Sequence, residues 1–418
     1  MSDAAEARRR FLRIAAAGVL FQGAAAAIDS GIIVATLVYG LTGSAFGVGA
    51  AAAISRAGWL APQLVVGYIA QRRPLLMPFY SLGAFGRAAC LAALAALLAF
   101  GAGLPRGWLV GLFFALWTLY AFIGGIVAVP YNDIVARAVP SQRRSRLLAV
   151  RFFGGGLLAL AVAAVAHRLL AALPFPEGHA ALLLLAASLL LASALSFVSA
   201  REPPAAAQAA AQSTFVEFLH AGLITLREDR RFRLFATAQW LGAAAAMALP
   251  FYILQASKAG ESAALAATLL GAQTAGALLS NPLWGWWGDR HGKAGLLRVV
   301  TLLGLVPPLL ALAWTAMVGS TFQPAALPWF AIVFALLGAA GNGGSIAQLG
   351  YLMEISPDER RPAYSGYFNA LVAPATLLPL VGAAVVHAIS LGAVFAVSAL
   401  AMVLQLLVID RLREEDDR

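Results

Sequence analysis

The sequence has little charge and almost no cysteine. Only 11% of its 418 residues are Asp, Glu, Lys or Arg, whereas 61% are hydrophobic, and the mean hydropathy is +0.82. This composition excludes an ordinary soluble globular protein. Cys90 is the only cysteine, so an intrachain disulfide is excluded, and cysteine usage says nothing about the redox compartment.

Motifs of enzymatic chemistry are also lacking. The sequence contains no metal-ligand cluster, no nucleophile elbow and no paired catalytic carboxylates. The run GAAGNGGS at Gly338 has the glycines of a phosphate-binding loop, but it follows no predicted strand and lacks the Lys-Ser/Thr pair. We therefore expect neither an enzyme nor a protein that holds a cofactor or a metal.

Long apolar runs dominate the rest of the sequence. At 1.5 Å per residue, about 20 residues cross a hydrocarbon core of roughly 30 Å. Twelve runs have this length, and the first lacks the cleavage site of a signal sequence. The prediction is an all-α membrane protein with 12 transmembrane helices, at residues 12–40, 45–70, 75–101, 107–134, 147–171, 178–199, 232–256, 262–287, 294–318, 325–354, 363–387 and 390–409.

Positive charge is concentrated in alternate loops and at both termini. Lys and Arg are retained on the cytoplasmic side of short loops, so we expect both termini in the cytoplasm. From the general composition we expect the membrane to be a bacterial inner membrane. We interpret the net charge of +10 as a topology signal and as contacts with membrane lipids, not as a nucleic-acid site. The basic loops contain Arg72, Arg73, Arg137, Arg143, Arg144, Arg146, Arg201, Arg227, Arg230, Arg231, Arg233, Arg290, Lys293, Arg360 and Arg361.

Residues 200–230 divide the twelve runs into two sets of six. The segment is first rich in Pro and Ala, and its later apolar residues follow a helical spacing at Phe215, Phe218, Leu219, Leu223 and Leu226. We predict a cytoplasmic linker with an amphipathic helix on the inner membrane face. It would join an N-terminal six-helix bundle at 1–199 to a C-terminal six-helix bundle at 231–418.

Two pairs of similar loops indicate an internal duplication. GYIAQRR at Gly67 follows the second run, and GWWGDRHGK at Gly285 follows the eighth, 218 residues later. VPSQRRSRLLAVRFF at Val139 precedes the fifth run, and SPDERRPAYSGYFN at Ser356 precedes the eleventh, 217 residues later. The near-constant offset predicts two pseudo-symmetric six-helix bundles.

These features together resemble the major facilitator superfamily of secondary transporters. The second-half loop has the superfamily's pattern at Gly285, Asp289, Arg290, Gly292 and Lys293, whereas the first-half loop keeps Gly67, Arg72 and Arg73 but has Gln71 in place of the usual Asp. The resemblance implies alternating access by a monomer, with these loops as a cytoplasmic latch that favours one state. Gln71 can hydrogen-bond there without the assistance of charge.

Asp133 and Glu354 lie near the cytoplasmic ends of the fourth and tenth runs. The resemblance places partners of the loop latch at these ends. We interpret both carboxylates as gating or structural residues. The alternative for the loop itself is that Asp289 and Arg290 only solvate a turn.

Three charged residues lie deep within the predicted spans: Asp29, Arg56 and Arg87. Each is costly there, so a function or a partner is expected. Asp29 is the candidate coupling residue, because burial favours a neutral carboxyl whereas a nearby arginine favours its charged form. The alternative is a permanent ion pair from Asp29 to Arg56 or Arg87.

Two arginines and one aspartate leave surplus positive charge, which suits an anionic substrate group. We expect Arg56 to bind substrate and Arg87 to be structural. Amides and aromatic residues are the other candidates, although each amide can equally hold two helices together. The candidate substrate contacts are Gln22, Trp117, Tyr120, Tyr252, Gln255 and Asn342.

The predicted function is transport of a small organic solute with an anionic group, coupled to protons or to sodium. Three alternatives stay open. A proton-driven exporter of drugs or amphiphiles is disfavoured because the fifth run lacks the G-P-x-x-G-G signature of such exporters in the superfamily. A lysolipid or lipid flippase and a non-transporting membrane sensor of the same fold are the others.

Overall fold

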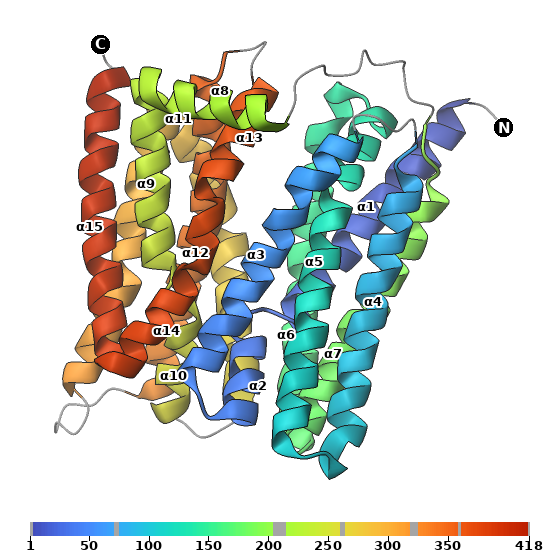
Figure 1. Cartoon of the computed structure of the whole chain (residues 1–418), viewed down its shortest axis with the longest axis vertical. Helices are drawn as coiled ribbons and strands as arrows, with labels where there is room; N and C mark the ends of the chain where they lie inside the picture. Colours follow the sequence, from blue (N-terminus) through green and yellow to red (C-terminus); the bar gives the residue numbers. More distant parts are fainter. Residues whose placement is uncertain are drawn as a thin grey trace. The chain divides into compact units, whose positions relative to one another are not determined.

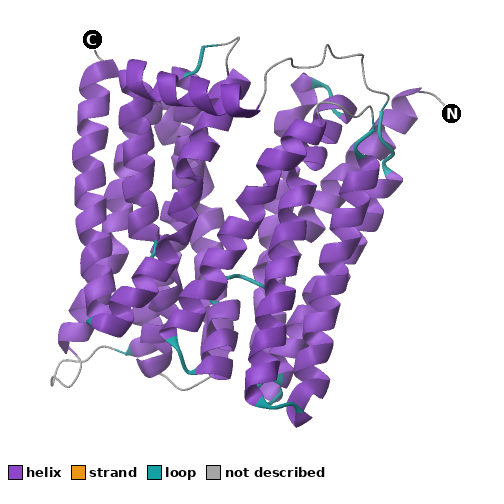
Figure 2. Cartoon of the chain, in the orientation of Figure 1, coloured by secondary structure: helices purple, strands orange, loops and turns teal. Residues whose placement is uncertain are grey.

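Helices make up nearly all of the chain in the computed structural model. It describes residues 3–70, 75–203, 215–259, 264–317, 325–357 and 361–416, and no β-strand occurs within these ranges (Figure 2). The absence of strands there agrees with the long apolar runs, because a helix satisfies its own backbone hydrogen bonds without water.

The first half contains eight helical elements, labelled in Figure 1. They are α1 Asp3–Ala27, α2 Ile33–Thr42, α3 Ala45–Ala70, α4 Met77–Phe100, the 3₁₀ turn η1 Gly101–Gly103, α5 Arg106–Ala138, α6 Ser141–Ala172 and α7 Glu177–Ser199.

The second half begins with a short helix in the predicted linker region. Its elements are α8 Phe215–Glu228, α9 Arg230–Ala246, α10 Leu249–Ala259, α11 Ala264–Met317, α12 Ala326–Ile355, α13 Arg361–Val372, the 3₁₀ turn η3 Ala373–Leu377, α14 Leu378–Ala388 and α15 Leu391–Asp416. Within α11, Gly292 has φ +73° and ψ 173°, so two helical segments meet there.

The elements coincide with the twelve predicted spans, but three spans are interrupted. The first span breaks between α1 and α2. The seventh breaks between α9 and α10, where Pro250 has no N–H to continue the helix. The eleventh comprises α13, η3 and α14, with Pro374 inside the 3₁₀ turn. The sequence periodicity did not indicate these breaks, because the residues on either side of them remain apolar.

Several helix ends follow from local chemistry. Pro105, Pro140 and Pro176 directly precede α5, α6 and α7, and proline suits this place because its φ is fixed and no donor is needed. The Asp229 carboxylate caps α9 by accepting from the Phe232 N–H at 3.0 Å. Gly43 ends α2 in the left-handed conformation at φ +66°.

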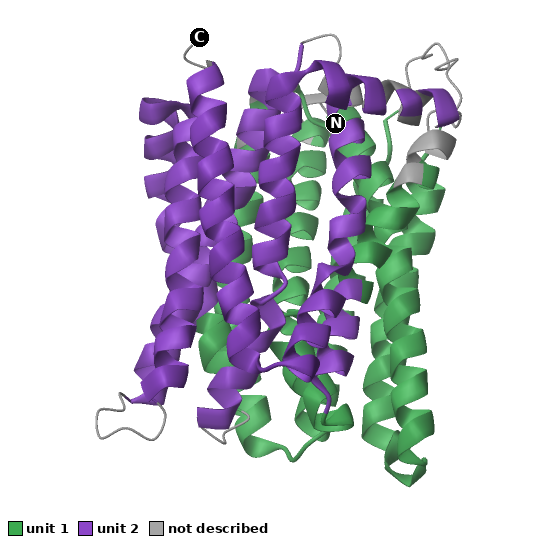
Figure 3. Ribbon diagram, turned by 60° about the vertical axis from the view of Figure 1, so that its left-hand side comes forward, with its two compact units in different colours: residues 1–43, 54–212, 262–271 green, residues 44–53, 213–261, 272–418 purple. Residues whose placement is uncertain are grey.

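The chain divides into two compact units (Figure 3). Unit 1 comprises residues 1–43, 54–212 and 262–271, and unit 2 comprises residues 44–53, 213–261 and 272–418. Helices α3 and α11 therefore contribute to both units. In unit 1, α1 packs against α6 and α7, and α4 packs against α5 and α7, whereas in unit 2 α9 packs against α15.

Each unit has its own aromatic core. In unit 1, Phe197 packs against Tyr80 and Tyr131, with ring centroids 4.2 and 5.0 Å apart. In unit 2, Phe235 packs against Tyr351 and Phe368, each with ring centroids 5.2 Å apart. Such ring pairs stabilise a core beyond their area of burial.

The helices are long and apolar enough to cross a membrane several times. Within the described ranges, nine helices meet this criterion, and one of them is the two-segment α11. Large apolar side chains also remain on the outside, among them Phe100, Leu82 and Leu279. Exposed apolar side chains on membrane-spanning helices suit contact with lipid. The chain is a multi-pass membrane protein.

Candidate functional site

Asp29 lies at the break in the first span. Its Oδ1 accepts hydrogen bonds from the backbone N–H groups of Gly31 and Ile32, at 3.0 and 2.9 Å. A short polar side chain can capture nearby backbone N–H groups in a turn, in place of a continuing helix. Asp29 is thus fixed in the turn between α1 and α2, in the middle of the first predicted span.

Arg56 of α3 is the charged neighbour of Asp29. The two side chains interact electrostatically, yet within the described chain no N···O distance of 4 Å or less joins them. The geometry is therefore looser than a tight ion pair. Arg56 also lines a pocket of about 250 Å³ together with Trp59, Arg87 and Tyr120.

Arg87 of α4 is almost fully buried, with 8% of its surface exposed. Its Nη2 donates to the Tyr120 hydroxyl at 3.0 Å. Its Cζ lies 5.2 Å from the ring centroids of both Phe21 and Tyr120. A guanidinium on an aromatic face is stabilised by the ring's negative charge. Aromatic rings and one hydroxyl therefore hold this cation, with no carboxylate among its neighbours within 4 Å in the described chain.

Arg151 of α6 is a second guanidinium within unit 1, partly buried, which the sequence analysis did not single out. Its Nη1 donates to the Tyr131 hydroxyl at 3.3 Å, and its Cζ lies 5.8 Å from the Phe21 ring and 5.2 Å from the Tyr131 ring. Gly18 makes room for it, because a Cβ at Gly18 would lie 2.7 Å from the Arg151 Cγ. Here too, no carboxylate of the described chain lies within 4 Å.

Arg87 and Arg151 line one cavity of unit 1, with a volume of about 140 Å³. Six helices contribute to its wall, and none of the wall residues is acidic. Its polar members are Tyr80, Arg87, Tyr131, Asn132, Arg151 and Ser193, and its aromatic apolar members are Phe21 and Trp59. Because Arg87 and Trp59 also line the pocket of Arg56, the two hollows share a wall. This is the strongest candidate for a ligand site.

Two further candidates of unit 1, Gln22 and Trp117, are not among the residues that line the cavity. Gln22 packs against α6, where a Cβ at Gly155 would lie 2.6 Å from the Gln22 Cβ. Trp117 is buried and stacks on Tyr120, with ring centroids 5.2 Å apart. It supports the tyrosine that contacts Arg87.

The unit 2 candidates lie in contacts between helices. Gln255 is buried, and its Nε2 donates to the Ala311 carbonyl and to Thr315 Oγ1, at 2.8 and 2.9 Å. Asn342 of α12 donates from Nδ2 to Asn281 Oδ1 of α11 at 2.8 Å. Tyr252 is buried and packs against the Phe395 ring at 4.7 Å. The amides thus join helices, which was the alternative left open for them, and their role as substrate contacts stays a prediction.

The loop around Gly292 joins the two segments of α11. Asp289 is highly exposed, at 85% of its side chain, and its nearest cation within the described part of the chain is Lys293 at 3.8 Å. Arg290 lies 5.7 Å from the Trp286 ring. A Cβ added to Gly285 would meet nothing within 4 Å. The carboxylate at Asp289 is therefore open to a further partner.

The first-half loop is described only in part. Gly67 lies in the last turn of α3. Gln71 and Arg72 lie outside the described residues. Glu354 is exposed near the end of α12.

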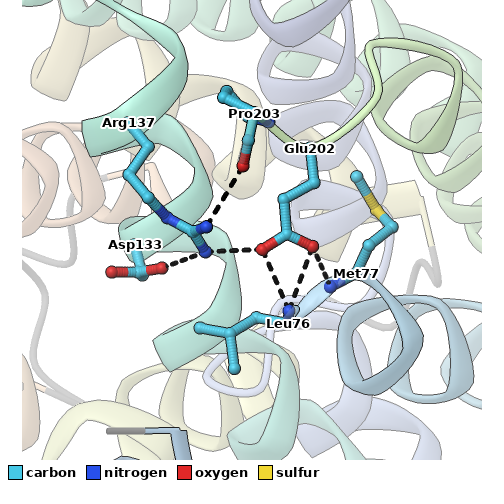
Figure 4. A network of polar contacts seen from close by, with 6 residues as sticks. All are labelled: Leu76, Met77, Asp133, Arg137, Glu202 and Pro203. Carbon is cyan, nitrogen blue, oxygen red and sulfur yellow. Dashed lines mark hydrogen bonds and ion pairs between the residues drawn. The ribbon is translucent and has the colours of Figure 1, made fainter. Parts of the chain in front are cut away.

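Asp133 belongs to a polar network at the end of α5 (Figure 4). The Arg137 guanidinium contacts both Asp133 and Glu202, and its Nη1 donates to the Pro203 carbonyl. Glu202 in turn accepts from the backbone N–H groups of Leu76 and Met77 at the start of α4. The network therefore ties α5, the start of α4 and the chain after α7 together within unit 1.

Comparisons with known proteins identify the architecture. Residues 236–417 match the model of the Major Facilitator Superfamily. A variant of the nucleoside transporter NupG has a TM-score of 0.76 to this chain at 13% identity, covering 96% of this chain and 99% of that chain. The chain has the major facilitator fold. The predicted resemblance to the superfamily and the predicted two-bundle, twelve-helix fold class are confirmed.

Other solved structures have the same fold. A POT family transporter in complex with a thioalcohol conjugated peptide has a TM-score of 0.73 at 12% identity, covering 98% of this chain and 96% of that chain. A D-xylose-proton symporter has a TM-score of 0.70 at 16% identity, covering 96% of each chain. At these identities the likeness shows the fold alone. No curated protein matches the chain in sequence.

Within the major facilitator fold of this chain, three of the predicted site residues line the two adjoining pockets of unit 1. These are Arg56, Arg87 and Tyr120. Sequence reasoning missed Arg151, Tyr80, Arg137 and Glu202. Arg151 had a signal, because it is a charge inside the predicted span 147–171, but it follows a run of arginines that reads as topology.

Proposed function

We propose that this protein is a secondary transporter that moves a small organic solute with an anionic group across a bacterial inner membrane, coupled to protons. Transport is the function expected of the major facilitator fold. The main support is the unit 1 cavity, whose wall contains the buried Arg87 and the partly buried Arg151 but no acidic residue. Guanidinium groups bind carboxylates through paired hydrogen bonds, and a cation without a counter-ion within a membrane protein favours an anionic ligand.

Asp29 is the proposed coupling residue. It lies at a helix break near Arg56 without a tight ion pair, so the carboxyl can gain or lose a proton without first breaking a short salt bridge. The structures named as a D-xylose-proton symporter and as POT family transporters have the same fold, and the first name describes coupling to protons in that protein.

The remaining parts of the proposal follow the resemblance. Residues 200–230 link the bundles at 1–199 and 231–418, and both termini are cytoplasmic. The loop residues Asp289 and Arg290 form a latch in one transport state, with the high exposure of Asp289 as support. The protein acts as a monomer surrounded by lipid, with no enzymatic step.

The test is transport by the purified protein in proteoliposomes that contain a pH-sensitive dye. We expect organic carboxylates to evoke proton movement, and neutral amides of the same size to evoke none. Asp29→Asn should abolish the proton signal but retain exchange of labelled for unlabelled solute, because exchange needs no net proton transfer. Glu177→Gln, which changes an exposed carboxylate at the start of α7, is the control.

Each alternative function gives a different result in the same vesicles. Movement of cationic amphiphiles, with no response to carboxylates, would identify a drug exporter. Movement of headgroup-labelled lysolipid would identify a flippase, and binding without any flux would identify a sensor. A full proton signal from Asp29→Asn would remove the coupling assignment.

A further inference from the structure

Three residues that line the unit 1 cavity have a hydrogen-bond donor without a partner in the described chain. Two of these donors are Nη1 of Arg87 and Nη2 of Arg151, since in each guanidinium the other Nη forms the only hydrogen bond there. The Tyr80 hydroxyl, which lines the same cavity, also lacks one among the contacts of the described chain. Unpartnered buried donors are costly, so an acceptor in the cavity would be bound favourably.

The two guanidinium groups are held in place independently. Tyr120 fixes one Nη of Arg87, and Tyr131 fixes one Nη of Arg151. In each group the other Nη forms no hydrogen bond within the described chain, and it can donate to a carboxylate oxygen. Two such guanidinium groups suit two carboxylates rather than one.

The same ring brings the two cations near each other. The Cζ atoms of Arg87 and Arg151 lie 5.2 and 5.8 Å from the centroid of the Phe21 ring. The distance between the two Cζ atoms therefore cannot exceed the sum of these two distances. Both groups also act electrostatically on Tyr80. A single compact molecule can reach both arginines.

The local charge count points to a ligand with two negative charges. The electrostatic neighbour of Asp29 is Arg56. The other carboxylates of the described chain that form ion pairs in unit 1 are those of Glu6, Asp133 and Glu202, and they pair with Arg10 and Arg137. A monoanion would leave one of the two cavity cations uncompensated, whereas a dianion compensates both.

The size of the cavity sets the size of the ligand. Its volume of about 140 Å³ is close to that of an engineered cavity of about 150 Å³ that binds benzene. Phe21, Trp59 and Tyr131 provide aromatic walls, which favour a flat apolar body.

We propose that this cavity binds a compact dicarboxylate, with one carboxylate on the guanidinium of Arg87 and the other on that of Arg151. The inference rests on the proposed function and names its substrate class. Tyr80 donates to one of the carboxylates, and the body of the ligand packs against Phe21.

The first test uses calorimetric titration of the full-length protein in detergent at pH 7.5. The probes share one ring: benzene-1,2-dicarboxylate, its monomethyl ester and its dimethyl ester. We expect the dicarboxylate to bind at least about tenfold more tightly than the monoester, because a hydrogen bond to a charged group contributes about that factor or more. Equal affinity of the dicarboxylate and the monoester overturns the proposal.

The second test locates the two charges. Arg87→Gln and Arg151→Gln should each reduce the preference for the dicarboxylate to within about threefold, since either variant leaves one cation. Arg168→Gln, at an exposed position of α6, should keep the full preference. If a glutamine variant does not fold, Arg87→Lys and Arg151→Lys keep the charge but lose the fork, and each should weaken dicarboxylate binding. A preference that survives both the Arg87 and the Arg151 changes overturns the assignment.

Failure of this proposal is distinguishable from failure of the proposed function. Vesicle transport of monocarboxylates, with no preference for dicarboxylates in binding, overturns only the dicarboxylate site. Tight dicarboxylate binding without any flux overturns transport and supports the site.

Discussion

Replacing Asp29 by asparagine and by alanine separates its two roles. Asparagine keeps an Oδ1 that can accept from Gly31 and Ile32, whereas alanine leaves both N–H groups of the turn before α2 without that partner. An unpartnered donor with limited access to water costs about 1–3 kcal/mol. We expect Asp29→Ala to lose about 2 kcal/mol of stability and Asp29→Asn to lose less than about 1 kcal/mol.

The assay is unfolding of the purified protein in detergent, with vesicle transport of a carboxylate measured in parallel. Both variants should lose the proton signal, because both lack the ionisable group, but only the alanine variant should be clearly destabilised. Equal stability of the wild type and Asp29→Ala would refute the role of Asp29 in holding this turn, which is derived from the two hydrogen bonds.

The Asp29–Arg56 relation is tested by a double-mutant cycle. If the pair is a static ion pair, Asp29→Asn with Arg56→Gln should recover much of the stability that each single change loses. A looser electrostatic relation, as the absence of an N···O contact within 4 Å in the described chain indicates, predicts a small coupling energy. A large one would favour the static pair over the coupling role.

Three further predictions concern packing and charge. Gly18→Ala places a Cβ 2.7 Å from the Arg151 Cγ, so benzene-1,2-dicarboxylate should bind about tenfold more weakly. Gly111→Ala, whose Cβ meets nothing, should leave the affinity unchanged, and calorimetric titration compares the two variants. Gly292→Ala should lower the free energy of unfolding by about 1–3 kcal/mol, since φ +73° with ψ 173° is a conformation that only glycine adopts readily. Gly285→Ala, whose added Cβ meets nothing within 4 Å, should leave the stability unchanged, and thermal unfolding compares the two variants. Glu202→Ala should cost about 3 kcal/mol of stability because it leaves Arg137 without its buried partner. Asp133→Ala, at a carboxylate that is 40% exposed, should cost less than about 1 kcal/mol. Equal losses in denaturant unfolding would contradict the view that Glu202 is the main partner of Arg137.

The candidate site was only partly predictable from the sequence. Arg56 and Arg87 are charges within apolar runs, so their cost in a membrane marks them without any structure. Arg151 follows Arg143, Arg144 and Arg146 after only a few residues, and in this context a charge at the start of a span resembles a topology signal.

The interpretation of single polar residues also needed the structure. Gln255 and Asn342 could equally contact a ligand or another helix, and their partners Thr315 and Asn281 lie 60 and 61 residues away in the chain. No local pattern predicts which of two distant helices an amide will meet.

The sequence by itself determined the number and position of the spans, because transfer of a segment into a membrane depends on its own length and hydropathy. It also indicated the duplication, because the loops repeat at a nearly constant offset. The tertiary structure alone decided that Asp29 lies in the turn between α1 and α2, and that Arg87 and Arg151 share the ring of Phe21. These features depend on how distant helices pack, since the space beside Gly18 and the aromatic faces that hold the arginines come from different segments of the chain.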